Sequence, residues 1–265
     1  MLEYRESGTG IPVVFAPGSC STGAAWRPVL AHLGDLRAIT TSLSGYGATA
    51  ERRSASDRSI VPVAEALEEV IAQAGGPVHL VGHSFGGLAG LAVALRGMAP
   101  LLSLTILEAP APGALIGTNE HTHLMEFRTM TEAYAAAHRS GDAHAIGAMI
   151  DFYGGSQSWT TMPEPVRAYA RSTTAVNLID WESAYGFELD GGTLSSLADL
   201  PVYVTVGARS HPAVVRANAL IAERIPGATY TTIAGAAHFM IATHPAEVAA
   251  LIKAQIVDQD PQYRE

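Results

Sequence analysis

The chain has 265 residues, of which 48% are hydrophobic and 15% are charged. This composition is typical of a globular protein with a substantial core and excludes a disordered chain. The formal net charge of −9 argues against nucleic acid or an anionic membrane surface as a partner, because like charges repel. The single cysteine, Cys20, excludes a disulfide within the chain and fits a reducing compartment.

The N-terminus does not have the pattern of an export signal. Glu3 and Glu6 stand where a signal peptide has a basic segment followed by an apolar one. No stretch approaches the ~20 consecutive apolar residues of a membrane span. We therefore expect a cytoplasmic protein.

The first part of the chain, to about residue 109, alternates short apolar segments with helical patterns. We expect strands at 12–16, 36–43, 77–81 and 101–107, and helices at 60–74 and 85–95. Glycines at 75 and 76, followed by Pro77, end the first of these helices in the usual order. This alternation predicts a parallel sheet with helices on both faces.

Strand-like segments are absent from the sequence pattern between residues 110 and 198. Helical patterns replace them at 123–139, 142–152 and 163–185. The alternation then returns, with strands expected at 201–206 and 228–233 and helices at 212–225 and 245–257. We therefore predict an α/β core made of residues 1–109 and 199–265, interrupted by a helical insertion, 110–198.

Residues 82–86, Gly-His-Ser-Phe-Gly, match the pattern G-x-S-x-G. A predicted strand leads directly into this segment and a predicted helix follows it, so Ser84 would lie on a sharp turn above the sheet edge. Glycines avoid clashes in such a turn, and the N-terminus of the helix favours developing negative charge. The pattern predicts Ser84 as a nucleophile, and a turn without catalytic function is the alternative.

A serine hydroxyl is a weak nucleophile until a base accepts its proton. His238 follows the last predicted strand, where such a base is expected, and the other nine histidines fit this role less well. His121 and His123 have the spacing of a metal-binding pair, but no cysteine or carboxylate cluster completes a site nearby. We interpret them as a solvated helix start and expect no metal.

These motifs resemble those of the α/β-hydrolase superfamily along nearly the whole chain. Residues 14–19, Val-Phe-Ala-Pro-Gly-Ser, stand where many members have His-Gly-x, with Pro17 in place of the histidine. Residues 43–47, Leu-Ser-Gly-Tyr-Gly, resemble the loop after the fourth strand of that family. The resemblance implies the α/β-hydrolase fold, with the insertion as a cap domain. It also implies that the backbone N–H groups of Ser19 and Phe85 form an oxyanion hole.

The segment Gly45-x-Gly47-x-x-Ala50 also fits a loose form of the dinucleotide-binding pattern. That motif requires an amphipathic helix directly after the glycines, whereas residues 51–54 read Glu-Arg-Arg-Ser. We therefore expect neither a dinucleotide nor another organic cofactor.

The acid that would orient His238 is missing from its usual place. In most of the family it follows the strand after the cap, but here that loop, residues 207–210, ends in Ser210, and no acid occurs from 201 to 222. A neutral hydroxyl cannot stabilise an imidazolium.

Glu108 offers a second position, because it directly follows the predicted strand 101–107. It lies 24 residues after Ser84, which is one helix and one strand further along the chain. Haloalkane dehalogenases and some lipases are relatives that place the acid after this earlier strand, and the resemblance therefore implies Glu108. A carboxylate that only caps the start of the insertion is the alternative, and Asp151 and Asp180 are more distant candidates.

The sequence thus predicts a serine hydrolase that cleaves a small-to-medium, mostly apolar carboxylic ester through an acyl-enzyme. A serine at the nucleophile position argues against the dehalogenases and epoxide hydrolases, which use aspartate there. A lyase or C–C bond hydrolase using the same serine and histidine is one alternative. A ligand-binding or regulatory protein with little turnover is another. We assign no role to Cys20, because nothing near it in the sequence argues for a lowered thiol pKa.

Overall fold

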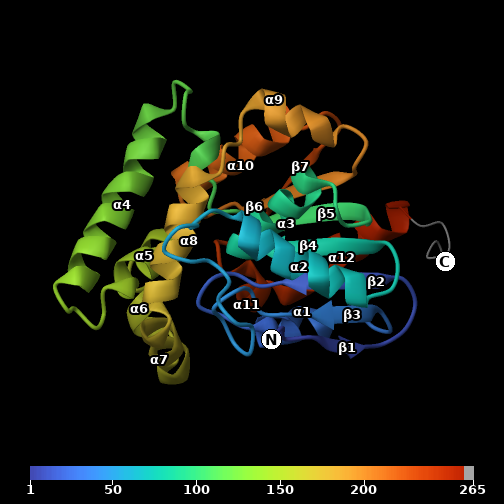
Figure 1. Cartoon of the computed structure of the whole chain (residues 1–265), viewed down its shortest axis with the longest axis horizontal. Coiled ribbons are helices and arrows are strands. Elements are labelled where there is room, and N and C mark those ends of the chain that lie inside the picture. Colours follow the sequence, from blue (N-terminus) through green and yellow to red (C-terminus); the bar gives the residue numbers. More distant parts are fainter. Residues whose placement is uncertain (260–265) are drawn as a thin grey trace.

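The computed structural model describes residues 1–259, so residues 260–265 of the expected core lie outside it. A seven-stranded sheet occupies the centre, with strand order β1-β3-β2-β4-β5-β6-β7 (Figure 1). The strands are β1 (Arg5–Ser7), β2 (Pro12–Ala16), β3 (Arg37–Thr40), β4 (Val78–His83), β5 (Leu101–Leu107), β6 (Val202–Gly207) and β7 (Thr229–Ile233). β1 is antiparallel to β3, and every other neighbouring pair is parallel. The predicted α/β fold with a mostly parallel sheet is confirmed.

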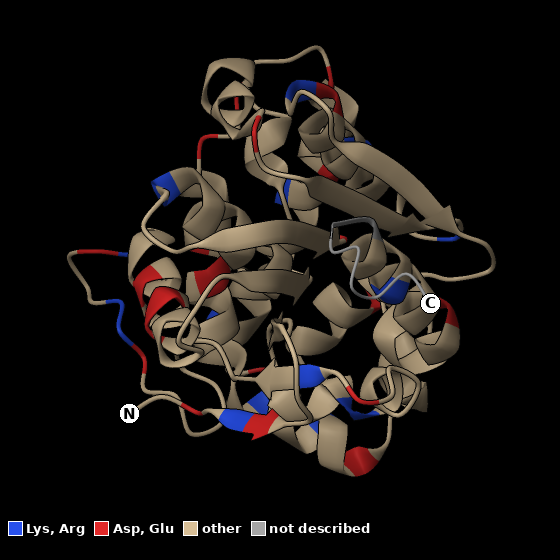
Figure 2. Ribbon diagram, turned by 90° about the vertical axis from the view of Figure 1, so that its right-hand side faces the viewer, with Lys and Arg blue, Asp and Glu red and all other residues tan. Residues whose placement is uncertain are grey.

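The central strands β2 and β4 are buried on both faces because both faces are covered. All residues of β2 and β4 are buried, and neither strand contains Lys, Arg, Asp or Glu. Charged residues lie instead on the surrounding helices and loops and on the edge of the sheet at β1 and β3 (Figure 2). Parallel sheets buried on two sides favour such uncharged, mostly apolar segments, which explains why these strands were recognisable in the sequence.

Two groups of helices cover the two faces of the sheet. α2 (Val61–Gln73), α3 (Phe85–Arg96) and α10 (Pro212–Arg224) pack with Val14 and Leu80 in one hydrophobic cluster. α1 (Arg27–Leu30), α11 (Met240–Thr243) and α12 (Pro245–Gln259) pack with Phe15 and Val81 in the other. Neighbouring residues of one strand thus enter opposite cores, as the two-residue period of a strand requires.

Every regular element described between β5 and β6 is helical. The α-helices there are α4 (His121–Arg139), α5 (Ile146–Gly154), α6 (Ser158–Thr161), α7 (Glu164–Ser172), α8 (Thr174–Gly186) and α9 (Gly191–Leu194). Figure 1 shows α4–α8 together beyond one end of the sheet, whereas α9 lies beside α10. Within residues 1–259, none of the helices combines the length and apolarity that a membrane-spanning segment requires.

The continuous helical segment expected at 163–185 is two helices, and that expectation is corrected here. α7 ends and α8 begins around Thr173, whose hydroxyl donates to the carbonyl oxygens of Tyr169 and Ala170 at 2.9 and 3.3 Å. Such side-chain bonds to the preceding turn compete with the regular backbone pattern and favour a bend or an end.

Candidate active site

Ser84 lies in the sharp turn between β4 and α3. Its φ is 53°, a left-handed conformation that is uncommon for a residue other than glycine. A Cβ on Gly82 would lie 2.3 Å from the carbonyl oxygen of Gly86, and a Cβ on Gly86 would lie 2.3 Å from that of Ala16. Both flanking positions therefore require glycine, because strand, turn and helix pass too close for any side chain.

Ser84, His238 and Glu108 lie in one hydrogen-bonded line. His238 Nε2 is 3.0 Å from Ser84 Oγ, and His238 Nδ1 is 2.8 Å from Glu108 Oε2. An ionised carboxylate only accepts hydrogen bonds, so Nδ1 carries the proton and donates it to Glu108. Nε2 is then the acceptor that faces the serine hydroxyl. The structure thus brings together the three side chains that the sequence analysis selected.

Glu108 is completely buried and fully hydrogen-bonded. Its Oε1 accepts from the backbone N–H of Gly207 at 2.5 Å and from the hydroxyl of Ser210. Burial alone would raise the pKa of this carboxyl, but the bonds from His238, Gly207 and Ser210 outweigh it and hold the pKa below its ordinary value. Glu108 is therefore a carboxylate at neutral pH.

Acidification is expected to remove the stabilising contribution of Glu108. Because the pKa in the folded protein lies below the ordinary value of 4.5, this contribution is complete above that value and is lost as pH falls through the folded pKa. The Tm of the wild type should therefore decline relative to that of Glu108→Gln as the pH falls below the ordinary value of 4.5. Thermal melts of both proteins measure this, and a Tm difference that does not depend on pH would contradict it.

Ser210, at the usual acid position, and Glu108 meet at the same point. The loop after β6 carries Ser210, and the Ser210 hydroxyl donates to the carboxylate that contacts His238. Parallel strands place their carboxyl ends at one edge of the sheet, so the loops after β5 and β6 are neighbours. Ser210 and Glu108 therefore belong to one hydrogen-bonded group at His238, in which Glu108 carries the charge.

The other acidic candidates lie elsewhere. Asp151 accepts a hydrogen bond from the backbone N–H of Trp159 at 2.7 Å, where it joins α5 to α6. Asp180 is buried and bonded to Ser19 and Tyr46. Neither carboxylate is hydrogen-bonded to His238 in the described structure.

His83 and Tyr153 support His238, and sequence reasoning gave neither a role. His83 Nε2 is 2.8 Å from the carbonyl oxygen of His238, and burial together with the nearby His238 lowers the pKa of His83 to about 3. His83 is therefore neutral and donates this bond. The ring of Tyr153, from α5, lies against the His238 ring with centroids 4.1 Å apart. For His83, its place next to Ser84 in the sequence indicated that it would lie near the site. For Tyr153 the sequence contained no such indication, because this residue belongs to a separate helix, α5.

The two residues predicted as oxyanion donors, Ser19 and Phe85, line the same cavity as Ser84. Phe85 is the first residue of α3, so its N–H has no acceptor within that helix. The loop after β2 passes directly over Ser84, since a Cβ on Gly18 would lie 2.8 Å from Ser84 Cβ. Ser19 follows in this loop and lines the same cavity as Ser84.

A cavity of about 730 Å³ opens above Ser84 and His238. Its walls are mostly apolar and come from both the sheet edge and the helices between β5 and β6. These helices contribute Met149, Ile150 and Tyr153 from α5, Tyr169 and Ala170 from α7, and Asn177, Asp180, Trp181 and Ala184 from α8. A substrate in this cavity would contact the helical segment and the serine together.

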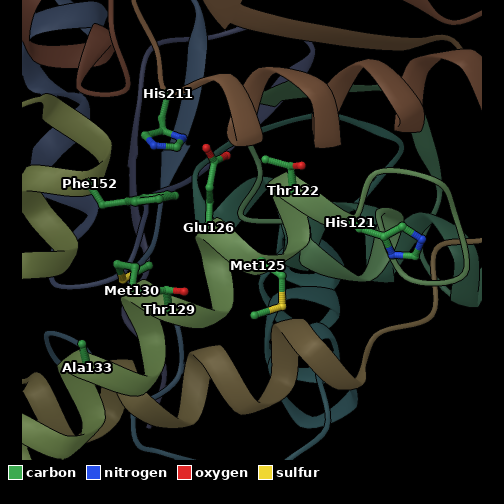
Figure 3. A pocket seen from close by; sticks show the side chains of 9 residues that line it. All are labelled: His121, Thr122, Met125, Glu126, Thr129, Met130, Ala133, Phe152 and His211. Atoms are coloured by element: carbon green, nitrogen blue, oxygen red, sulfur yellow. The ribbon is translucent and has the colours of Figure 1, made fainter.

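A separate surface groove of about 780 Å³ lies along α4 (Figure 3). His121 lines it, as do Phe152 and His211, whose rings stack with centroids 4.0 Å apart. Neither Ser84 nor His238 lines this groove. His123 Nδ1 is 3.1 Å from Glu126 Oε2, and residues 1–259 contain no group of three or more His, Cys, Asp or Glu placed to hold a metal ion.

Cys20 is a shielded thiol next to Ser19. Burial raises its pKa to about 12, so the thiol remains protonated at neutral pH.

Residues 13–251 match the model of the alpha/beta hydrolase family. The chain belongs to this family. The resemblance inferred from the sequence motifs is thereby confirmed. The α/β-hydrolase fold also explains the geometry of the turn at Ser84, because this family places its central strand, sharp turn and helix in that order.

Individual curated proteins match only part of the chain. A protein of Azorhizobium caulinodans named as a carbamate hydrolase is 30% identical over 140 residues, 51% of this chain and 52% of that protein. A protein of Mycobacterium tuberculosis named as a non-heme bromoperoxidase is 38% identical over 112 residues, 41% of either chain. The chain therefore spans about half, or less, of the length of these curated relatives.

The solved structures agree in fold over almost the whole length. A thermophilic esterase from Thermogutta terrifontis has a TM-score of 0.76 at 20% identity, covering 97% of this chain and 93% of that one. At this identity the likeness shows that the α/β-hydrolase fold is shared and says nothing of substrate.

Proposed function

We propose that this α/β-hydrolase is a serine esterase that acts on small-to-medium, mostly apolar carboxylic esters. The observation that carries the proposal is the line from Ser84 through His238 to Glu108, which opens on an apolar cavity. A hydroxyl, an imidazole and a buried carboxylate in this order are the components of a serine nucleophile with its base and orienting acid.

In the first half-reaction, Ser84 Oγ attacks the ester carbonyl carbon while its proton moves to His238 Nε2. The π electrons of the carbonyl move to its oxygen, and the N–H groups of Ser19 and Phe85 stabilise this oxyanion. Glu108 holds the ring of His238 and stabilises the imidazolium. When the tetrahedral intermediate collapses, the bond to the alkoxy group breaks and His238 donates its proton to the departing alcohol.

In the second half-reaction, water replaces the alcohol. His238 accepts a proton from the water as its oxygen attacks the acyl carbon. A second oxyanion forms at the same two N–H groups, and its collapse releases the acid and returns the proton to Ser84. Every group in this cycle belongs to the chain, so the proposed reaction requires no cofactor.

The size and lining of the cavity support the proposed substrate class. A volume of about 730 Å³ is within the range of roughly 300–1,000 Å³ typical of small-molecule sites. We assign residues 110–198 as the cap domain, because helices of this segment form much of the cavity wall. Residues 1–109 and 199–265 are then the core.

The test is hydrolysis of a series of 4-nitrophenyl esters from acetate to dodecanoate by the purified protein. We expect cleavage of the short and medium acyl chains, because the mostly apolar cavity can enclose them. A fluorophosphonate should label Ser84 stoichiometrically, which separates an activated serine from a binding cavity. The proposal is wrong if no ester is cleaved, and release of products from a hydroxynitrile or a β-diketone would then favour the lyase or C–C hydrolase alternative.

A further inference from the structure

Asp180 of α8 connects the helical segment to two loops of the core. Its Oδ2 accepts hydrogen bonds from the hydroxyls of Ser19 at 2.5 Å and Tyr46 at 2.6 Å. Its Oδ1 lies 2.8 Å from Nη1 of Arg53, an ion pair by distance. Ser19 follows β2, whereas Tyr46 and Arg53 follow β3. One carboxylate thus fixes the relative positions of elements that are far apart in the sequence.

Asp180, Arg53 and Tyr46 are buried, and Asp180 accepts its hydrogen bonds as a charged carboxylate. The side chains of Asp180 and Arg53 are almost completely inaccessible. Burial raises the pKa of Asp180 to about 6, although Arg53, Ser19 and Tyr46 favour the charged form. At neutral pH the group is therefore an anion that accepts both hydroxyl bonds, and bonds to a charged acceptor are stronger than neutral ones.

The hydrogen bond between Ser19 and Asp180 connects this buried group to the proposed oxyanion hole. The proposed mechanism uses the backbone N–H of Ser19, whose orientation depends on the loop after β2. This loop passes so close to Ser84 that a Cβ on Gly18 would clash with the serine side chain, and Cys20, the residue after Ser19, has a φ of 56°. A loop with a strained residue needs a contact that holds it in place, and the bond from Ser19 Oγ to Asp180 is such a contact.

We propose that Asp180 is a positioning residue, which sets the oxyanion hole by holding the Ser19 side chain and so couples the helical segment to catalysis. This inference rests on the proposed function, because it needs Ser19 as an oxyanion donor. Preorganised donors stabilise a transition state only when they point at the developing charge. Asp180 is hydrogen-bonded to neither Ser84 nor His238 in the described structure, so its connection to the reacting groups runs through Ser19, although it also lines the cavity.

The test compares Ser19→Ala and Asp180→Asn with the wild type. Ser19→Ala keeps the backbone N–H and removes only the hydroxyl that Asp180 holds. We expect kcat to fall about ten- to a hundredfold with little change in KM, less than the roughly 10²–10³ lost when a whole oxyanion donor is removed. Ser19→Thr, which retains the hydroxyl, should restore most of kcat. Asp180→Asn should lower kcat at least as much.

A second readout separates positioning from general destabilisation. A trifluoromethyl ketone forms a tetrahedral adduct with Ser84, with its oxyanion in the same hole. Its affinity should fall by about the same factor as kcat in Ser19→Ala, whereas a purely structural role would lower Tm and leave this affinity unchanged. The double variant Ser19→Ala/Asp180→Asn should lose no more than Asp180→Asn alone, since both act through one contact.

Tyr46→Phe is the matched control, because it removes the other hydroxyl bonded to the same carboxylate oxygen. Tyr46 does not belong to the loop over Ser84, so kcat should stay within about twofold of the wild type even if Tm falls. Wild-type kcat and inhibitor affinity in Ser19→Ala would overturn the inference while leaving the esterase proposal intact. Absence of ester hydrolysis by the wild type would instead contradict both the esterase proposal and the inference on Asp180.

Discussion

Replacement of Ser84 by alanine should lower kcat for ester hydrolysis by about 10⁶-fold, the order found when a serine protease loses its nucleophile. The substitution removes the atom that forms the acyl-enzyme, and no other hydroxyl is hydrogen-bonded to the His238 ring in the described structure. The residual rate should be that of water attack assisted by the oxyanion donors. Steady-state kinetics on the best ester of the series measures the effect.

The Ser84→Ala protein should remain folded. A φ of 53° is as unfavourable for serine as for alanine, so the substitution adds no backbone strain. The lost hydroxyl has His238 as its hydrogen-bond partner. Tm should therefore change by only a few degrees, the shift expected for at most about 1 kcal/mol in a domain of this size. Ser44→Ala is a suitable control, because it removes a buried hydroxyl that does not line the cavity and should leave kcat nearly unchanged. More than a few per cent of wild-type activity in a folded Ser84→Ala protein would refute the esterase mechanism.

The sheet was predictable wherever burial on both faces made a strand apolar. β2 has the predicted bounds, Pro12–Ala16, and β5 matches the expected 101–107. β1 was not predicted, because Arg5–Ser7 is an exposed polar edge segment whose only strand signal is its pairing with β3. That pairing is a tertiary property and leaves no periodicity in the sequence.

The location of Glu108 beside His238 was predictable for a different reason. Fold resemblance limited the acid to the ends of two strands, and only one of these, at Glu108, carried a carboxylate. The sequence contained no sign that Ser210 would bond to that same carboxylate, or that Tyr153 would pack against His238. Contacts between loops and between separate helices depend on three-dimensional packing, which residue spacing does not encode.

Glu108→Gln is expected to lower kcat by about 10⁴-fold, the order measured when a serine protease loses the charge of its acid. The neutral amide still fits between Gly207 and Ser210, but it no longer stabilises the imidazolium. The NH₂ group of glutamine can also donate to His238 Nδ1, which would place the ring proton on Nε2 and leave Ser84 without a base. KM should change little, because Glu108 does not line the cavity.

Ser210→Ala should cost far less than Glu108→Gln. It removes one hydrogen bond to Glu108 but keeps the charge, the bond from Gly207 and the bond to His238. The expected loss in kcat is about tenfold at most, equivalent to roughly one hydrogen bond of about 1.4 kcal/mol. The comparison of the two single variants decides the assignment. A nearly silent Glu108→Gln, or an equal loss in Ser210→Ala, would show that the acid is misassigned.

Adding Ser210→Asp to Glu108→Gln tests whether the charge can act from the neighbouring loop. The Ser210 hydroxyl already reaches the carboxylate that orients His238, so an aspartate at this position should bring its charge close to the ring. We expect the double variant to recover at least tenfold in kcat over Glu108→Gln, because a carboxylate near Nδ1 again stabilises the imidazolium. Asparagine at position 210 is the control, since it matches aspartate in size and lacks the charge. Equal recovery with Ser210→Asn would mean that shape, and not charge, is restored at the sheet edge.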